Sequence, residues 1–476
     1  MTGDYLFEHA LVITMEGTGL GIIADGAVCV KEDKIVAVGE TAEVKKSYTA
    51  HRVISAHNKV IMPGLIDAHM HSGLGILRGV AQDTHHWMEK GLWPFMQFLT
   101  GEQRTAGSLV NLIEAVKAGT TTICDYDGGM TDIVKNHVQL GTRARVCDMI
   151  NEMTESKSEE REVGELYAFD PAVGERKRQS NVELFEQYHE TENGRITCLF
   201  GPQGPDMMSL ELLLDIQSLA EKYNTGLHMH VAQGDREIDQ MLLRYGKRSI
   251  PYLEEHGFLN ERLMAVHLTE ATAKETKTVA SSGAAMILCS GSIGIIDGIV
   301  PPAKEFLETS DRFALGSDQA PGNNCNNMFN EMKFTSILNK CKYQDPTLFP
   351  AWQMVKATTI NAAKAIGMDN EIGSLTPGKK ADLIMLDLHS PALFPRINGP
   401  IRNIVPNLVF SASGQEVEFV MIDGNVVVED RVVQTVDEKE AMRNGQKHAD
   451  QLAASARKIS GKLDTPLAGM MKDGLL

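Results

Sequence analysis

Short apolar runs, broken by glycine and acidic residues, fill the first sixty positions of the chain. Residues 10–14 and 35–39 are rich in β-branched side chains, which is typical of short strands joined by tight turns. The pattern returns near the other end, where Asp423-Gly424 between two apolar runs predicts a hairpin turn. We expect the two β-rich ends, residues 1–60 and 371–436, to meet as one small β-sandwich domain.

Between residues 61 and 370 the rhythm changes to apolar runs that alternate with helical stretches. Such alternation predicts a parallel α/β architecture, and eight strand–helix units predict a closed (β/α)8 TIM barrel over residues 61–370. Helix-forming composition from about 437 to 462 predicts a C-terminal helical tail within residues 437–476. The eight expected strands lie near residues 61–71, 120–124, 145–150, 195–200, 225–230, 263–268, 284–289 and 312–316.

Charge and composition narrow the classes of partner. The 476 residues carry 46 basic and 63 acidic side chains, and the net charge of −17 argues against a nucleic-acid or membrane-surface partner. No stretch approaches 18 uninterrupted apolar residues and the first residues lack a signal-peptide pattern, so we expect neither a membrane-spanning nor a secreted protein. The seven cysteines are widely spaced with no Cys-x-x-Cys pair, which is typical of reduced thiols in a cytoplasmic protein.

The apolar run that leads into His69-Met70-His71 carries the first sign of chemistry. On a strand, side chains two positions apart point to the same face, so His69 and His71 would present two imidazoles together. Taken alone, the pair fits two hydrogen-bonded histidines at a strand end equally well. Active sites of barrels lie at the C-terminal ends of the strands, and His230, His267 and Asp318 end other expected strands. Because the chain has only 15 histidines, this gathering indicates a metal site.

Imidazoles with one carboxylate suit a single divalent ion. Zn²⁺ is the first expectation, with Fe²⁺ or Mn²⁺ as alternatives, because histidine nitrogen and carboxylate oxygen bind all three. An ion of this kind lowers the pKa of a bound water molecule to about 7, which makes hydroxide available at neutral pH. The sequence therefore indicates a hydrolytic site.

Four segments resemble the amidohydrolase superfamily. Residues 63–71, Pro-Gly-Leu-Ile-Asp-Ala-His-Met-His, look like its opening signature, and residues 118–125 resemble its second strand. Residues 316–332 resemble the region of its eighth strand, and residues 373–387 resemble its closing β-segment. Together the resemblance covers most of the chain from about 5 to 430. The nearest branch looks like the one that holds the triazine hydrolases and the guanine, cytosine and S-adenosylhomocysteine deaminases.

This resemblance implies a role for each residue of the cluster. His69, His71, His230 and Asp318 would bind one metal ion. Asp318 would also act as the general base, taking a proton as water attacks an sp² carbon. His267 would hydrogen-bond the attacking hydroxide or the substrate. Chemistry supports this independently, because a carboxylate that touches both metal and water can accept a proton without an unusual pKa of its own.

Each of these roles has an alternative. His228 faces the same way as His230, one layer deeper, and could replace it as a ligand or serve as a buried, hydrogen-bonded histidine. His267 could be merely structural, and Asp318 could cap the helix that follows it. Trp87 could stack on a flat ring or anchor its loop in the core. Substrate contacts are expected from Gln203, Trp87, His86, Ser290 and Asn323.

Position 233 departs from the pattern of the deaminases. They carry a glutamate three residues after the histidine of the fifth strand, where it shuttles protons, but this chain has Gln233 there. Glutamine can hydrogen-bond a carbonyl or ring nitrogen, yet it cannot transfer a proton reversibly at neutral pH. Gln233 stays among the expected catalytic residues with three interpretations open. Asp318 alone could do the proton work, Asp235 or Glu237 could swing in, or the substrate could need no ring protonation.

Two further departures concern substrate choice. Residues 201–205 and 288–292 lie at strand ends and differ from the deaminase pattern, which indicates a substrate other than the standard purine and adenosine analogues. We expect a metal-dependent hydrolase acting on C–N bonds of a small N-heterocyclic molecule, with deamination first. Hydrolysis of a cyclic amide, or removal of an alkylamine or halide, is the alternative, and a non-catalytic metal-containing binding protein is a third. We also expect a homo-oligomer, dimer or larger.

Overall fold

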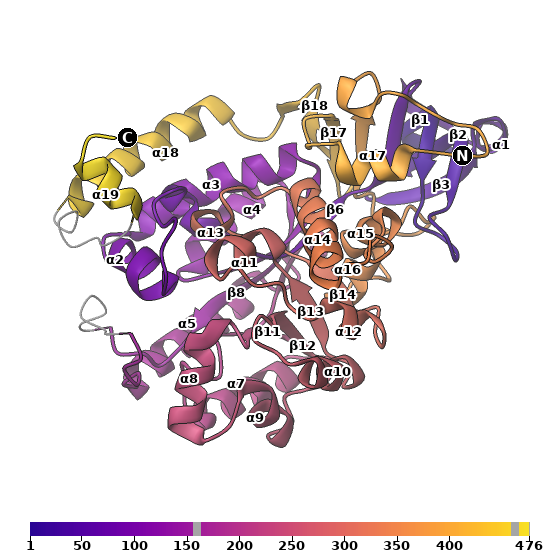
Figure 1. Cartoon of the computed structure of the whole chain (residues 1–476). Helices are drawn as coiled ribbons and strands as arrows, with labels where there is room; N and C mark the ends of the chain where they lie inside the picture. Colours follow the sequence, from indigo (N-terminus) through magenta and orange to yellow (C-terminus); the bar gives the residue numbers. More distant parts are fainter. Residues whose placement is uncertain (156–162, 458–465, 476) are drawn as a thin grey trace.

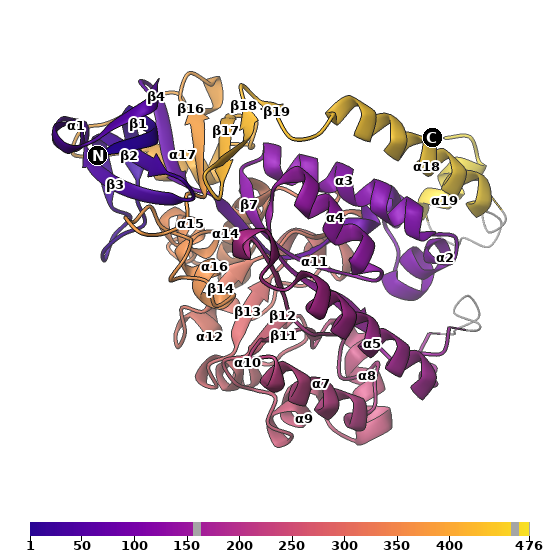
Figure 2. The same ribbon diagram turned by 180° about the vertical axis from the view of Figure 1, so that it is seen from behind.

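A computed structural model describes residues 1–155, 163–457 and 466–475. The fold is mixed α/β, with parallel sheets in the central part of the chain and a mostly antiparallel sheet built from its two ends. In Figure 1 the indigo strands of the N-terminal segment and the orange-to-yellow strands of the C-terminal segment lie side by side at one end of the molecule. Figure 2 shows the same arrangement from behind.

One nine-stranded sheet joins the two ends of the chain. Its strands are β1 (Thr2–Ile13), β2 (Ile22–Lys31), β3 (Lys34–Glu40), β4 (Thr49–Ser55), β5 (Lys59–Pro63), β16 (Leu383–Asp387), β17 (Val417–Ile422), β18 (Asn425–Glu429) and β19 (Val432–Val433). Their order is β19-β18-β17-β16-β5-β1-β2-β3, with β4 paired to β1. Antiparallel pairing of Ile61 with Met385 joins β5 to β16. The β-rich ends therefore share one sheet, while the division into the two sheets of a sandwich stays a prediction.

Parallel strands carry the central part of the chain. They are β6 (Leu65–His71), β7 (Thr120–Asp127), β8 (Arg143–Ile150), β9 (Ile196–Cys198), β10 (Gly201–Pro202), β11 (Leu227–Val231), β12 (Leu263–His267), β13 (Ala285–Leu288), β14 (Phe313–Leu315) and β15 (Asp318–Gln319). One sheet runs β10-β8-β7-β6-β15, with β9 on β8, and a second runs β11-β12-β13-β14. A bridge from Phe200 to Leu227 joins the sheets on one side, and pairing of Asp318 with Met70 ties β15 to β6 on the other. The strands pair in the order of the eight expected units.

Helices alternate with these strands and surround them in Figures 1 and 2. The helices of the described residues, including those of the two chain ends, are α1 (Thr41–Ser47), η1 (Ser72–Leu77), η2 (Trp87–Leu92), α2 (Trp93–Met96), α3 (Gly101–Lys117), α4 (Met130–Leu140), α5 (Pro171–Tyr188), α6 (Thr191–Gly194), α7 (Leu210–Lys222), α8 (Gly234–Tyr245), α9 (Ser249–Glu255), α10 (Ala273–Ser281), α11 (Ser290–Ile296), α12 (Ala303–Leu307), α13 (Ala320–Asn323), α14 (Met328–Tyr343), α15 (Ala351–Ala357), α16 (Ile360–Ala365), η4 (Pro391–Leu393), α17 (Ile404–Phe410), α18 (Glu438–Ala456) and α19 (Pro466–Lys472). Local chemistry sets some of their starts: Thr100 and Gln103 form a capping box at α3, and Thr272 and Glu275 form one at α10.

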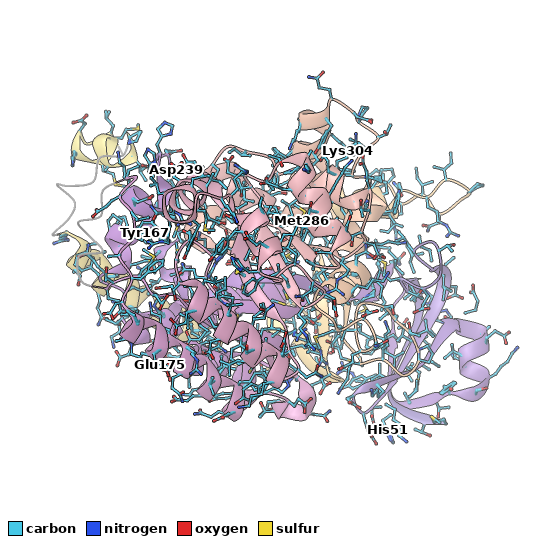
Figure 3. All side chains as sticks on the ribbon, turned by 90° about the horizontal axis from the view of Figure 1, so that it is seen from below. His51, Tyr167, Glu175, Asp239, Met286 and Lys304 are labelled. Carbon is cyan, nitrogen blue, oxygen red and sulfur yellow. The ribbon has the colours of Figure 1, made fainter. Side chains whose placement is uncertain are left out.

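The central strands are buried along their length. Every residue of β6 and of β7 is buried, the polar ones included, as expected for parallel strands covered on both faces. In Figure 3 the fully buried Met286 of β13 lies among the ribbons, whereas the exposed Glu175 and His51 lie towards the edges. Because His69 and His71 belong to β6, their ring nitrogens need polar partners inside the protein.

A buried ion pair ties the central strands to the sheet of the chain ends. Arg143 of β8 is fully buried, and its Nε lies 2.6 Å from Oδ2 of Asp382. Its Nη2 lies 3.0 Å from Oδ1 of Asp423. Asp382 precedes β16 and Asp423 follows β17, so one guanidinium holds two segments of the other sheet against β8.

The helix α18 forms part of the predicted C-terminal tail. It ends at Ala456, and the last residues of the expected helix, 458–462, lie outside the described residues. Leu452 of α18 packs with Leu74 and Trp87 from the segment after β6, and α18 runs beside α3 in Figure 2. Over the part of the chain that the structure describes, no helix has the length and apolar character needed to cross a membrane. The expected compartment and oligomeric state stay predictions.

Candidate metal centre and cleft

Five buried side chains from four strands converge at one point. His69 and His71 come from β6, His230 from β11, His267 from β12 and Asp318 from β15. One ligand atom each of His69, His71 and His230 lies within 4.8 Å of the others, and the same holds for His69, His267 and Asp318. Oδ1 of Asp318 is 3.5 Å from Nε2 of His69 and 3.4 Å from Nε2 of His71. The structure therefore brings together all the residues expected at the metal.

The ring nitrogens of this cluster fit a cation. Nε2 of His69, Nε2 of His230, both nitrogens of His267 and Oδ1 of Asp318 are buried, and among the described residues none of them has a hydrogen-bond partner. Leaving one buried polar atom without a partner costs about 1–3 kcal/mol. A divalent ion between them would satisfy several of these atoms at once, and this donor set is one that Zn²⁺ accepts.

Contacts behind the cluster set which nitrogen carries the proton. Nδ1 of His230 lies 2.7 Å from the backbone carbonyl oxygen of Gln203, which can only accept, so Nδ1 donates and Nε2 keeps its lone pair. Nδ1 of His69 lies 2.8 Å from Nε2 of His228. His228 is thus buried behind His69, which corresponds to the hydrogen-bonded role that the sequence left open for it.

Burial keeps the imidazoles neutral. It lowers the pKa of His69 to about 4 and that of His267 to about 3, and it lowers the pKa of His230 well below the usual value. Burial opposes ionisation of Asp318 as well, but the facing imidazoles of His69, His267 and His71 outweigh it and hold the pKa of that carboxyl well below its usual range. At neutral pH the cluster offers imidazole lone pairs and one carboxylate, the forms that bind a metal.

The backbone is strained where two of these side chains leave it. His267 has φ of 79° and Asp318 has φ of 59°, values that residues with a Cβ rarely adopt. Asp67 helps to hold this geometry, because its carboxylate accepts hydrogen bonds from the backbone N–H groups of His69 and Ser317. Sequence reasoning gave Asp67 no role, although its place two residues before the first histidine was the available signal.

A cleft of about 440 Å³ opens above the cluster. Its inner part is lined by His71, His230 and three glutamines, Gln203, Gln233 and Gln319. Its remaining lining has seven apolar side chains, Leu74, Met88, Leu92, Trp93, Met96, Met149 and Met153, together with Gln97, Arg104, Asn151, Thr154, Glu155 and Lys177. The cleft thus combines an amide-rich floor with a methionine-rich wall.

A second cavity of about 170 Å³ lies on the other side of Gln233. It is lined by His267 and Asp318 of the cluster, and Gln233 and Met88 line both this cavity and the cleft. Its remaining polar wall is mostly acidic: Glu89, Asp235, Glu270 and Asp297, with Arg236, His85 and His86. We call it the acidic cavity.

The expected substrate contacts divide into two groups. Gln203 lines the cleft, and His86 and Trp87 line the acidic cavity. Trp87 is also a core anchor, because it is 4% exposed, packs with Leu92 and donates from Nε1 to the carbonyl oxygen of Ala81 at 2.5 Å. Both interpretations of this tryptophan therefore have support in the structure.

Ser290 and Asn323 require a correction. Neither lines the cleft or the acidic cavity as the described residues form them. Both are 4% exposed: Ser290 accepts a hydrogen bond from Thr335, and Asn323 donates to the backbone of Ser317 and to Glu331. These hydrogen bonds join α11, α13 and α14.

Of the two acids considered as substitutes near Gln233, Glu237 is also corrected. Its carboxylate is fully buried and accepts from the backbone N–H groups of Ala232 and Gln233 at 2.7 and 2.8 Å, so it holds the turn and has no path into the cavity. Asp235 is exposed and lines the acidic cavity. Sequence reasoning missed Asp297 and Glu270, which reach the same cavity from separate parts of the chain.

Comparison with known families decides the affiliation. The family model of the amidohydrolases matches residues 60–427, more than half of the chain. This chain belongs to the amidohydrolase family. The resemblance drawn from its motifs is confirmed.

Relatives place this amidohydrolase near the nucleoside deaminases. It is 30% identical over 427 residues to a 5-methylthioadenosine/S-adenosylhomocysteine deaminase of Thermoanaerobacter pseudethanolicus, covering 89% of this chain and 94% of the relative. It shares its fold with an adenosine deaminase of Xanthomonas campestris solved with bound zinc, with a TM-score of 0.86 and 26% identity over 95% and 99% of the two chains. An atrazine chlorohydrolase of Arthrobacter aurescens, complexed with zinc, has the same fold at 20% identity, with a TM-score of 0.81 over 94% and 100%.

These findings fix the general activity. The amidohydrolase is a metal-dependent hydrolase that acts on carbon–nitrogen bonds other than peptide bonds, and its substrates are small molecules. The site uses a divalent metal ion.

Proposed function

We propose that this amidohydrolase is a zinc-dependent deaminase that removes the exocyclic amino group of an adenine nucleoside. The observation that carries the proposal is the convergence of His69, His71, His230, His267 and Asp318 at the inner end of a substrate-sized cleft. The relatives named above as deaminases of adenosine derivatives support the substrate class. This differs from the expectation drawn from residues 201–205 and 288–292, which pointed away from adenosine analogues.

In this proposal His69, His71, His230 and Asp318 hold the ion, and His267 orients the attacking water. When bound, a zinc ion lowers the pKa of a coordinated water molecule to about 7 and so supplies hydroxide at neutral pH. Asp318 takes a proton from the water as it adds to the ring carbon, and passes that proton to the departing amine. The low pKa of Asp318 keeps it ionised and ready to accept.

The shape of the cleft supports an adenine nucleoside with an apolar substituent. The amide groups of Gln203, Gln233 and Gln319 can both donate and accept hydrogen bonds, as the edge of a purine requires. Farther out, Met96, Met149 and other apolar side chains fit a flexible hydrocarbon or thioether arm, because methionine packs adaptably against irregular groups. A substrate of this kind would place its ring at the cluster and its arm along the methionine wall.

Gln233 favours a second candidate reaction. A leaving group that departs without a proton on the ring, such as halide or an alkylamine on an electron-poor ring, does not need the missing glutamate. The candidate therefore remains hydrolytic removal of such a group, or opening of a cyclic amide, at the same metal.

We also propose the finer architecture that the sequence predicts. Residues 61–370 would form a closed (β/α)8 barrel, residues 1–60 and 371–436 a β-sandwich domain, and residues 437–476 a helical tail. The cyclic strand order, the shared nine-stranded sheet and α18 support these three parts.

Ammonia release separates the two reactions. Purified protein loaded with Zn²⁺ is incubated with adenosine, 5′-methylthioadenosine, 5′-deoxyadenosine and S-adenosylhomocysteine, and in parallel with 6-chloropurine and 6-alkylaminopurine ribosides. We expect ammonia and the corresponding hypoxanthine product from the adenine nucleosides. If the chloro or alkylamino compounds are turned over and the adenine nucleosides release no ammonia, the second candidate is favoured and the deaminase is rejected.

A further inference from the structure

Asp297 is an acid of the acidic cavity that the reaction described so far does not use. It follows α11 directly, and it lines the cavity together with His267, Asp318 and Gln233. Its side chain is solvent-accessible, so a bound molecule can reach it. Among the described residues, none forms a hydrogen bond or ion pair with its carboxylate that would tie it to the wall.

The Asp297 carboxylate also lies beside the turn that carries Gln233. Its Oδ1 is 3.5 Å from the place where a Cβ at Gly234 would stand. Gln233 and Asp297 also line the same cavity. Two other nearby acids are already engaged, since Glu237 accepts from two backbone N–H groups and Asp318 belongs to the metal cluster.

Deamination of adenine needs an acid at this point. When water adds to the carbon that bears the amino group, electron density moves onto the adjacent ring nitrogen, and a proton there lowers the barrier. General acid catalysis of this kind contributes about 10²–10⁴-fold in rate. Glutamine at position 233 can hold the ring by a hydrogen bond, but it cannot supply that proton.

We propose that Asp297 is the catalytic acid that protonates the purine ring nitrogen, in place of the glutamate that Gln233 replaces. The inference rests on the deaminase function proposed above. Gln233 then positions the ring, and Asp297 approaches it from the acidic cavity.

The proton balance closes with these two carboxyl groups. Asp318 takes one proton of the water as its oxygen bonds to the ring carbon, while the Asp297 acid gives its proton to the ring nitrogen. Asp318 passes its proton to the amino group, and the carbon–nitrogen bond breaks with release of ammonia. The proton of the new hydroxyl returns to the Asp297 carboxylate as the carbonyl forms, which restores both groups.

The surroundings of Asp297 keep it protonated near neutrality. Neighbouring protein atoms that displace part of its hydration, together with the negative charges of Asp235 and Glu270, raise the pKa of Asp297 to about 7. Arg236 lowers this pKa, and Asp318 raises it. His85, His86 and Glu89, from the segment after η1, complete the charged or titratable wall of the cavity.

The test compares Asp297→Asn with wild type and with the surface variant Asp239→Asn. Asp239 is an exposed aspartate on α8 that does not line the cavity. Its substitution by asparagine removes the same charge as Asp297→Asn does. For zinc-loaded proteins we expect Asp297→Asn to lower kcat for 5′-methylthioadenosine at least about 100-fold. KM and zinc content should change less than threefold, and Asp239→Asn should match wild type.

The double variant Gln233→Glu/Asp297→Asn gives the sharper readout. A glutamate at position 233 supplies a replacement acid, so we expect the double variant to have at least tenfold higher kcat than Asp297→Asn. The inference is overturned if Asp297→Asn keeps full activity. It is also overturned if the double variant is no more active than Asp297→Asn alone. Absence of ammonia from wild type with every adenine nucleoside rejects the proposed function itself, whereas an active wild type with an unaffected Asp297→Asn rejects this inference alone.

Discussion

Nε2 of His228 lies 2.8 Å from Nδ1 of His69, so one of these nitrogens donates a hydrogen bond to the other. If His69 donates it, Nε2 of His69 keeps a lone pair directed at the cluster; if His228 donates it, Nε2 of His69 carries a proton and cannot bind a metal. Sγ of Cys147 lies 3.9 Å from Nδ1 of His228 and can accept a hydrogen bond from it. A neutral His228 that is protonated on Nδ1 has a free lone pair on Nε2, which favours donation by His69. His228 is therefore a positioning residue that acts through His69.

Removing this partner should weaken metal binding without removing a ligand. We expect His228→Phe to lower zinc affinity by about 10–100-fold, the usual effect of losing a group that orients a ligating histidine. His228→Gln, whose amide oxygen can accept from Nδ1 of His69, should retain most of the affinity. Competition with a chromogenic chelator measures both, with exposed His51→Gln as the control. Equal zinc affinity of His228→Phe and wild type would show that the contact is only structural.

Activity should depend on the metal through the proposed ligands. We expect His71→Ala and His230→Ala to hold far less than one zinc ion per chain and to release no detectable ammonia. Dialysis of wild type against a chelator should abolish activity, and Zn²⁺ should restore it. Elemental analysis and the ammonia assay check this together, with His51→Ala as the matched surface change. A chelated wild-type protein that keeps its full rate would contradict the metal-dependent mechanism.

Gln233 should control which leaving group the site prefers. We expect Gln233→Glu to raise kcat/KM for adenine nucleosides by about tenfold or more, because a second acid reaches the ring. The rate with a 6-chloropurine riboside should change much less. Initial rates on both substrates give the ratio, and Gln446→Glu on the exposed face of α18 controls for added charge. Unchanged ratios would place Gln233 outside the proton path.

The pH dependence should report the carboxyl of Asp297. The protonated form is the active one, so kcat should fall as the pH rises through about 7, the pKa of this group. Asp235→Asn removes a negative charge that raises this pKa, so the fall should move to lower pH. Profiles of kcat between pH 5 and 9 test both statements. If kcat falls at the same pH in Asp235→Asn as in wild type, or still falls in Asp297→Asn, the titrating group is another residue.

Stability should depend strongly on Arg143. Breaking a buried ion pair by removing one partner costs about 3–5 kcal/mol, because the other charge stays buried without compensation. We expect Arg143→Ala to lower the free energy of unfolding by about that amount, since Asp382 loses its partner, while Asp423 keeps only Lys380. Arg443→Ala, which removes an exposed pair with Glu440, should change the free energy of unfolding far less, because solvent screens that pair. Denaturant melts of the two variants check the contrast, and equal midpoints would mean that the buried pair is not stabilising.

Much of the metal cluster could be predicted from local pattern. Alternation along β6 puts His69 and His71 on one face, and parallel strands bring their C-terminal ends to the same edge. His230, His267 and Asp318 each end an apolar run, so their meeting followed from the strand order alone. The motif of residues 63–71 added the family, which the family model confirms.

The substrate contacts could not be predicted in the same way. Ser290 and Asn323 stand at suitable strand and helix ends, but partners from α14 such as Thr335 and Glu331 turn them into packing contacts. Glu237 lies near Gln233 in sequence, yet its carboxylate accepts hydrogen bonds from the backbone N–H groups of the turn. These outcomes depend on hydrogen-bond partners from other elements, which no local pattern encodes.

The sequence by itself determined the strand order, the family and the residues gathered at the metal, because each follows from periodicity within a short segment and from ends that parallel strands must share. Only the tertiary structure decided that His228 lies behind His69, that Gln233 separates the cleft from the acidic cavity, and that Asp297 lies beside Gly234. Asp297 and Gly234 are far apart along the chain and belong to different strand–helix units. The fold brings the start of α8 and the end of α11 together. Distance across the fold, rather than spacing along the chain, sets which groups can exchange a proton.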